Sequence, residues 1–113
     1  MEFLVHIQVQ WPPDGDPEQR AKLIAAEAAR SKELAAAGTI KRVWRIPGQW
    51  ANYGLWEAPD ATAVHAALSS LPFFPWLKVE VTPLAAHPND PLQWAGEATE
   101  RPARGRRAQR VSH

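Results

Sequence analysis

The sequence contains no cysteine among its 113 residues. Disulfides, thiolate nucleophiles and cysteine-based zinc sites are therefore excluded, and the composition is compatible with a reducing compartment. No apolar run approaches the roughly 20 residues that span a bilayer. The net charge is only +1, which is lower than expected for a protein that binds nucleic acid electrostatically. We expect a cytoplasmic protein with neither a membrane nor a nucleic acid as its partner.

Motifs for metal and phosphate chemistry are also missing. The four histidines are scattered and show no spacing such as H-x3-H, so no metal site is predicted. Neither the G-x-S-x-G pattern of serine nucleophiles nor a glycine-rich phosphate loop occurs.

Tryptophan, in contrast, is abundant in this short chain. Large rings bury much area and favour ligand pockets and subunit interfaces. The alternative is that they fill a small core. The six positions are Trp11, Trp44, Trp50, Trp56, Trp76 and Trp94.

Hydrophobic periodicity predicts four strands and two helices. The predicted elements are a strand at 3–11, a helix at 16–37, strands at 40–46 and 50–57, a helix at 59–71 and a strand at 77–82. This order is the ferredoxin-like β-α-β-β-α-β plan, an α+β fold whose antiparallel sheet carries two helices on one face. The other face would be bare in a monomer, so we expect a dimer or a larger homo-oligomer.

The length fits one domain. We place a ferredoxin-like domain at residues 1–88 and a C-terminal extension at residues 89–113. The extension is polar and arginine-rich beyond Glu97, and we expect disorder beyond about Ala98.

Glu27 lies within the apolar stripe of the first predicted helix, between Leu23 and Leu34. A partly desolvated carboxylate has a raised pKa, which suits a general base. The alternative is an ordinary ion pair, with candidate partners Arg30, Lys22 and Lys78.

The segment 44–53 places aromatic rings, a guanidinium, an amide and a phenol beside the turn at Pro47-Gly48. We interpret this hairpin as one wall of a small-molecule site. Adjacent strand residues point to opposite faces, so Asn52 and Tyr53 are not expected to line one monomer pocket. One of them would then serve across a subunit contact.

The sequence resembles a known family, muconolactone delta-isomerase of the β-ketoadipate pathway. The resemblance extends from the first strand to His87-Pro88 without a detectable gap. It is carried by Asp16-Pro17, Glu27, Gly38-Thr39, Trp44-Arg45-Ile46, Gly48, Ala51-Asn52-Tyr53, His65, Leu71-Pro72, Phe74-Pro75, Glu80-Val81 and His87-Pro88.

The resemblance implies an isomerase that moves a proton within an unsaturated lactone, converting muconolactone to 3-oxoadipate enol-lactone in aromatic catabolism. No cofactor is implied, because a base and an oxyanion stabiliser suffice. Glu27 and Tyr53 would be catalytic, as the base and as a donor to the enolate oxygen. The implied substrate-binding residues are Arg45 as a carboxylate clamp, with Trp50, Asn52 and Trp44.

The resemblance also implies a dimeric α/β barrel-type assembly, such as a decamer built from dimers. Two departures leave the substrate open: Lys41-Arg42 stands where the family has Arg-His, and Gln49-Trp50 where it has His-Tyr. The alternatives are a chloromuconolactone dehalogenase, a natural-product isomerase or cyclase, and a non-catalytic ferredoxin-like binding module. An ordinary core tyrosine is the alternative for Tyr53.

Overall fold

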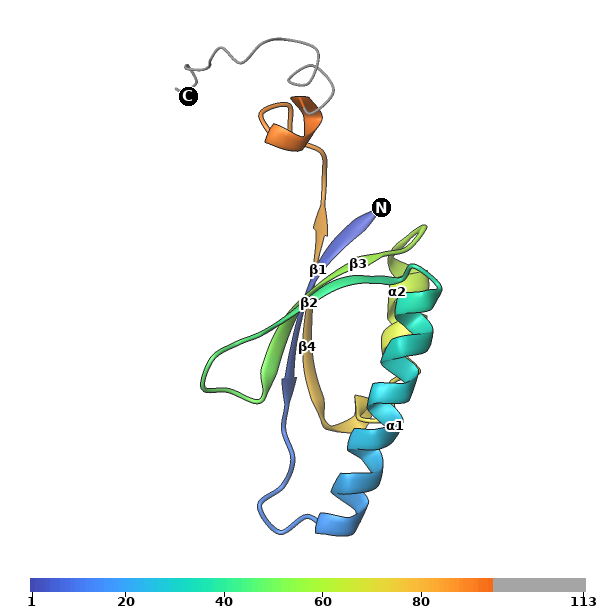
Figure 1. Ribbon diagram of the computed structural model, residues 1–113, viewed down its shortest axis with the longest axis vertical. Coiled ribbons are helices and arrows are strands. Elements are labelled where there is room, and N and C mark those ends of the chain that lie inside the picture. The colour runs from blue at the N-terminus through green and yellow to red at the C-terminus, as the bar shows by residue number, and fades with distance from the viewer. Residues whose placement is uncertain (95–113) are drawn as a thin grey trace.

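Four strands and two α-helices follow one another in the order that the sequence predicts (Figure 1). The computed structural model describes residues 1–94. The elements are β1 (Glu2–Val9), α1 (Pro17–Ala36), β2 (Ile40–Arg45), β3 (Ala51–Glu57), α2 (Ala61–Ser69) and β4 (Leu77–Leu84), with short 3-10 turns η1 (Phe74–Trp76) and η2 (Pro91–Trp94).

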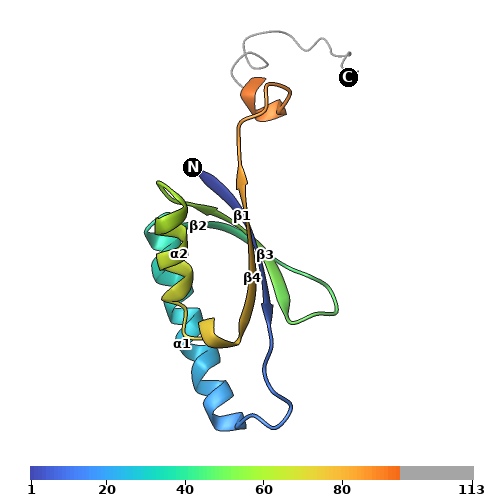
Figure 2. The same cartoon turned by 180° about the vertical axis from the view of Figure 1, so that it is seen from behind.

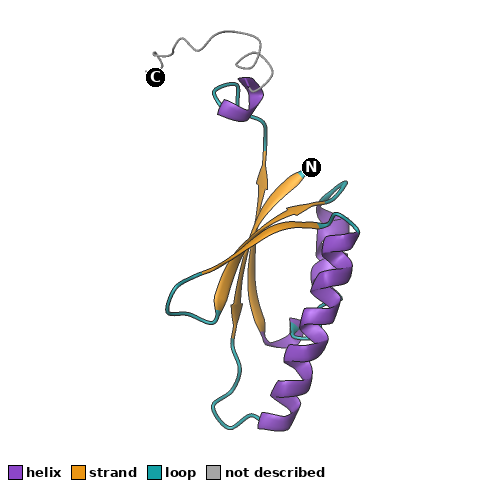
Figure 3. Ribbon diagram, in the orientation of Figure 1, coloured by secondary structure: helices purple, strands orange, loops and turns teal. Residues whose placement is uncertain are grey.

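The strands form one antiparallel sheet in the order β2-β3-β1-β4. This topology confirms the predicted ferredoxin-like fold. Both helices lie on one side of the sheet, as the two opposite views in Figures 1 and 2 show. Figure 3, coloured by secondary structure, shows strands alone on the other side. That bare side is called the open face below.

The core lies between the helices and the sheet. Phe3, Val5 and Ile7 alternate on β1 and are almost fully buried. They pack with Leu34 of α1 and Leu68 of α2 in one hydrophobic cluster. The buried face of β1 therefore packs against the apolar faces of the two helices, as the sequence predicts.

Local signals set the helix ends. The Asp16 carboxylate accepts a hydrogen bond from the Glu18 N–H at 3.1 Å, and Pro17 occupies the first helical position of α1. Gly38 follows the helix with a φ of 84°, a left-handed conformation that glycine adopts without a steric penalty. Asp60 begins α2 in the same way, accepting from the Ala63 N–H at 2.8 Å.

β1 ends at Val9, two residues before the predicted end of the strand at residue 11. Pro12 and Pro13 have no N–H to continue the ladder. Trp11 turns its ring against Trp76, with the ring centroids 5.1 Å apart. A residue that was predicted to extend the strand instead packs beside its end.

A β-bulge between Ile40 and Arg42 changes the face to which β2 side chains point. An inserted residue reverses the alternation beyond it. As a result Val43 and Arg45 share the helix-covered face with Ile40, and Arg42 and Trp44 point to the open face.

β4 leads the chain away from the body of the domain toward η2 (Figure 1). The disorder predicted beyond about Ala98, and the side chain of Trp94, lie outside the part of the chain that the structure describes. Among residues 1–94, no helix is both long enough and apolar enough to cross a membrane.

Candidate active site

Glu27 lies half-buried on α1, on the side that faces the sheet. Its Oε1 atom accepts a hydrogen bond from the backbone N–H of Phe73 at 3.0 Å. Burial raises the pKa of this carboxyl above its ordinary value, and the Phe73 N–H opposes that effect because it stabilises the anion. Desolvation is the larger of the two causes. The carboxylate therefore has the character of a general base.

The alternative explanation for Glu27 was an ion pair, with Arg30 among its partners. Arg30 instead contacts Glu33, with Nη1 2.8 Å from Oε1, and donates through Nε to the Ser70 hydroxyl at 2.9 Å. Within residues 1–94, Glu27 has no ion-pair partner. The Arg30–Ser70 bond also ties α1 to the end of α2, one helical turn from Glu27.

Three aromatic rings surround Phe73, the residue whose backbone N–H donates to Glu27. The Phe73 ring meets Trp11, Trp50 and Trp76 edge to face, at centroid distances of 6.0, 5.6 and 6.4 Å. These four residues are called the aromatic wall below. Edge-to-face rings of this kind form an apolar surface of defined shape. The wall places an apolar surface beside a desolvated carboxylate.

The hairpin residues divide between the two faces of the sheet. Asn52 pairs with Ile7 and with Arg45, so both polar side chains share the helix-covered face with the core. Trp50 also lies on this side, because its ring contacts Phe73. The structure thus brings Glu27, Trp50, Asn52 and Arg45 to the same side of the sheet.

Tyr53 and Trp44 lie on the opposite side. They pair with one another across β2 and β3, and Tyr53 pairs with His6 of β1. Their side chains are 43% and 44% exposed. The sheet therefore separates Tyr53 and Trp44 from Glu27 within a single protomer, and Asn52 and Tyr53 lie on opposite faces as the strand alternation predicts.

The open face carries a row of interacting side chains across all four strands. The Tyr53 ring lies 4.9 Å from the His6 ring, and His6 Nδ1 lies 3.3 Å from Glu80 Oε1. At the other end of the row, the Arg42 guanidinium stacks 4.9 Å from the centroid of the Trp44 ring. This arrangement leaves Tyr53 half-exposed, not buried as a core tyrosine.

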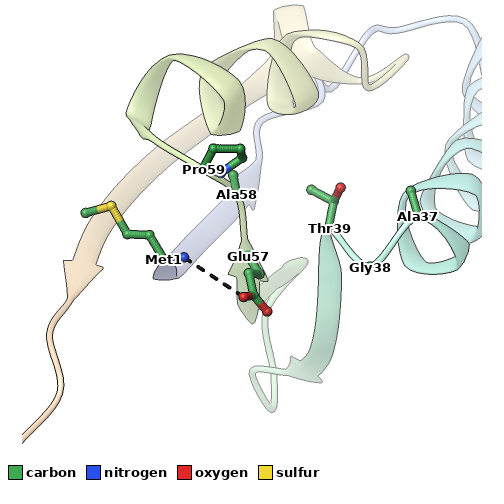
Figure 4. Close-up of a pocket in the computed structure, with 7 residues that line it drawn as sticks. All are labelled: Met1, Ala37, Gly38, Thr39, Glu57, Ala58 and Pro59. Carbon is green, nitrogen blue, oxygen red and sulfur yellow. Dashed lines mark ion pairs between the residues drawn. The ribbon is translucent and has the colours of Figure 1, made fainter.

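A surface pocket of about 430 Å³ occurs at the far end of the sheet (Figure 4). Met1, Thr39, Glu57 and Pro59 contribute to its lining, and the Met1 amino group lies 3.9 Å from Glu57. Glu57 pairs with Glu2 at one end of β1, and the aromatic wall lies at the other end. The pocket contains none of the predicted site residues.

Sequence reasoning missed three members of the site. Phe73 follows the helix stop at Leu71-Pro72, and only its neighbours Phe74 and Pro75 were singled out. Trp11 and Trp76 were counted among the tryptophans without a role. A signal was present, since three large rings follow the helix stop within five residues and such rings favour burial.

The fold and the site define a class: a small ferredoxin-like α+β protein with a desolvated carboxylate beside an aromatic wall. The model of the family described as muconolactone delta-isomerase matches residues 1–90. The chain belongs to the muconolactone delta-isomerase family. This membership confirms the resemblance and the predicted class of enzyme, an intramolecular isomerase.

Individual relatives agree with the family assignment. The muconolactone delta-isomerase of Pseudomonas aeruginosa is 38% identical over 89 residues, which cover 79% of this chain and 93% of that protein. That of Rhodococcus opacus is 39% identical over 88 residues, covering 78% and 95%. A crystal structure of muconolactone isomerase superposes with a TM-score of 0.75 at 38% identity, covering 80% of this chain and 94% of that chain.

Proposed function

We propose that the protein is a cofactor-independent isomerase that converts muconolactone to 3-oxoadipate enol-lactone in aromatic catabolism. The observation that carries the proposal is the Glu27 carboxylate, desolvated on α1 and held by the Phe73 N–H at 3.0 Å. The names and the high coverage of the relatives support the same substrate.

Glu27 would act as the base. The Phe73 N–H occupies Oε1, so Oε2 is the oxygen that would accept a proton from the lactone ring. That proton is acidified by conjugation with the lactone carbonyl, and its removal gives a dienolate. The protonated Glu27 then returns the proton at another ring carbon. Proton transfer by a positioned side chain typically contributes about 10²- to 10⁴-fold to the rate.

The helix-covered face would bind the rest of the substrate. Trp50 would contact the lactone ring as part of the aromatic wall. Asn52 carries an amide that can donate to the developing enolate oxygen, and it pairs with Arg45 on β2. Arg45 would bind the carboxylate of the carboxymethyl group through charge-assisted hydrogen bonds.

Tyr53 and Trp44 would pack within a subunit contact, on the side of the sheet opposite Glu27. The open face presents half-exposed or exposed apolar side chains on four strands, among them Leu4, Leu55 and Leu84. An apolar sheet face of this kind favours association. We propose a dimer of the α/β barrel type, built from two open faces and assembled further into a ring such as a decamer.

The catalytic domain would comprise residues 1–88 and the extension residues 89–113. The family match to residue 90 supports this boundary. A cytoplasmic location is proposed because the relatives are metabolic enzymes and the chain has no cysteine that a disulfide would use.

The test is to follow the ultraviolet spectrum of muconolactone with purified protein. Turnover to the enol-lactone at a rate proportional to enzyme supports the proposal. The departure at Gln49-Trp50 motivates a second candidate, dehalogenation of chloromuconolactone, because Trp50 is part of the aromatic wall. Chloride release from the chlorinated lactone, with no turnover of muconolactone itself, would replace the first function by the second.

A further inference from the structure

A cation lies on the aromatic wall. The Arg20 guanidinium carbon lies 4.8 Å from the centroid of the Trp50 ring. A guanidinium over the face of an indole is attracted by the negative face of the ring, and it keeps its N–H groups at its edge. Trp50 in turn meets Phe73, whose N–H donates to Glu27. Arg20 is thus connected to the Glu27 carboxylate through a cation–π contact, a ring–ring contact and one hydrogen bond.

The helix adds a second connection. Arg20 and Glu27 are seven positions apart on α1, so they lie two turns apart on nearly the same face. Their backbone positions are separated by roughly 10 Å along the axis. The long side chain of Arg20 can bring its guanidinium closer to Glu27 than the backbone distance. That shorter distance suits a small acid whose carboxylate and acidic carbon are only a few bonds apart.

Three other cations on the helices and the sheet are held by side chains away from the aromatic wall. Arg30 contacts Glu33, and Lys41 contacts both Glu2 and Glu57. Arg42 lies on the open face over Trp44. Arg20, in contrast, has no carboxylate partner among residues 1–94. Its planar set of donors therefore remains open to a ligand.

We propose that Arg20 determines specificity by binding the carboxylate of the substrate, and that Trp50 holds its guanidinium in place. This inference rests on the proposed function and adds a second cation to the one proposed on β2. It assigns the ligand class as an unsaturated lactone with an anionic side chain. Arg20 binds from α1, and Glu27 works on the ring beside it.

The experiment compares muconolactone with its neutral methyl ester in the full-length protein. For Arg20→Gln, we expect the KM for the acid to rise about tenfold or more, since a hydrogen bond to a charged group is lost. The KM for the ester should change less than about twofold, because it has no charge to bind. Arg20→Lys should recover part of the discrimination, and Trp50→Leu should lose part of it.

Lys22→Gln is the matched control, because it removes one positive charge from the same end of α1 on another side of the helix. It should leave both KM values near those of the wild type. A merely structural role for Arg20 would raise the KM for acid and ester alike, or leave both unchanged, and either result would overturn the inference.

Failure of the proposed function has a different signature. If the wild-type protein turns over neither compound, binding of the acid and of the ester is measured by titration calorimetry. A preference for the acid that Arg20→Gln abolishes supports the role of Arg20 even then. A wild-type protein with no preference for the acid overturns it.

Discussion

The Glu27 carboxylate and the Phe73 amide are separated by 46 positions in the chain and meet at 3.0 Å. One belongs to α1 and the other to the loop after α2, so the contact forms only when both helices dock on the sheet. The fold thus creates the hydrogen bond that orients the proposed base. It also places that base where burial raises its pKa.

Replacing Glu27 by glutamine removes the proposed proton acceptor and nearly preserves the shape of the side chain. We expect kcat for muconolactone to fall by about 10²- to 10⁴-fold. The measurement is the steady-state rate, with circular dichroism and thermal unfolding as checks on the fold. Glu33→Gln, an exposed carboxylate on the same helix, should retain nearly full activity. Near-normal turnover by Glu27→Gln would refute the assignment of the base.

The pH dependence of stability should also report on Glu27. The pKa of this carboxyl is raised in the folded state above the value of 4.5 expected when unfolded. Between these two pKa values the folded state binds more protons, so the contribution of Glu27 to stability is lost as the pH rises. Glu27→Gln cannot ionise and escapes this loss.

The difference in melting temperature, Glu27→Gln minus wild type, should therefore increase as the pH is raised from about 4 to about 7. Scanning calorimetry across that range measures it. A difference that stays constant, or that decreases with pH, would contradict the desolvation of Glu27. The acid limb of kcat/KM should lie above the ordinary range of a glutamate for the same reason.

Gly15 leaves space for the Trp11 ring to pack against the other residues of the aromatic wall. A Cβ atom at this position would lie 2.5 Å from Trp11 Nε1, a distance that forces the ring to move. We expect Gly15→Ala to lower the free energy of unfolding by about 1–3 kcal/mol and to alter the near-ultraviolet circular dichroism. Adding Trp11→Phe, which shortens the ring, should restore part of the loss. Additive losses in the double variant would argue against this contact.

The proposed dimer can be tested on the open face. Trp44→Asp places a charge on an exposed indole position of β2. If the open faces pair, the dissociation constant of the dimer should rise about 30-fold or more, as for a central aromatic residue of an interface. Sedimentation equilibrium measures it, and Ile24→Asp on exposed α1 serves as the control. An unchanged molecular mass for Trp44→Asp would show that this face does not pair.

The fold could be predicted because its signals are local. Alternation on β1, the caps at Asp16 and Asp60 and the stop at Gly38 each act within a few residues. The partial burial of Glu27 could be predicted as well, since its place in an apolar stripe follows from helical spacing alone.

The rest of the site depends on features that no local pattern contains. The face of Trp44 is set by the bulge between Ile40 and Arg42, and a bulge reverses alternation without a distinctive sequence. Phe73 contacts Glu27 only through the packing of two helices. Arg20 appears in the sequence as an ordinary charged residue, and its contact with Trp50 exists only in three dimensions.

Two hydrogen bonds, about one helical turn apart on α1, join this helix to the end of α2 and the segment after it. One joins Arg30 to Ser70, and the other joins Glu27 to Phe73. Together they hold the segment from Ser70 to Phe73 against α1. The Phe73 amide proton can consequently be used to observe the state of the Glu27 contact. Its nuclear magnetic resonance signal follows the charge on Glu27, and its exchange with solvent deuterium measures how often the loop opens.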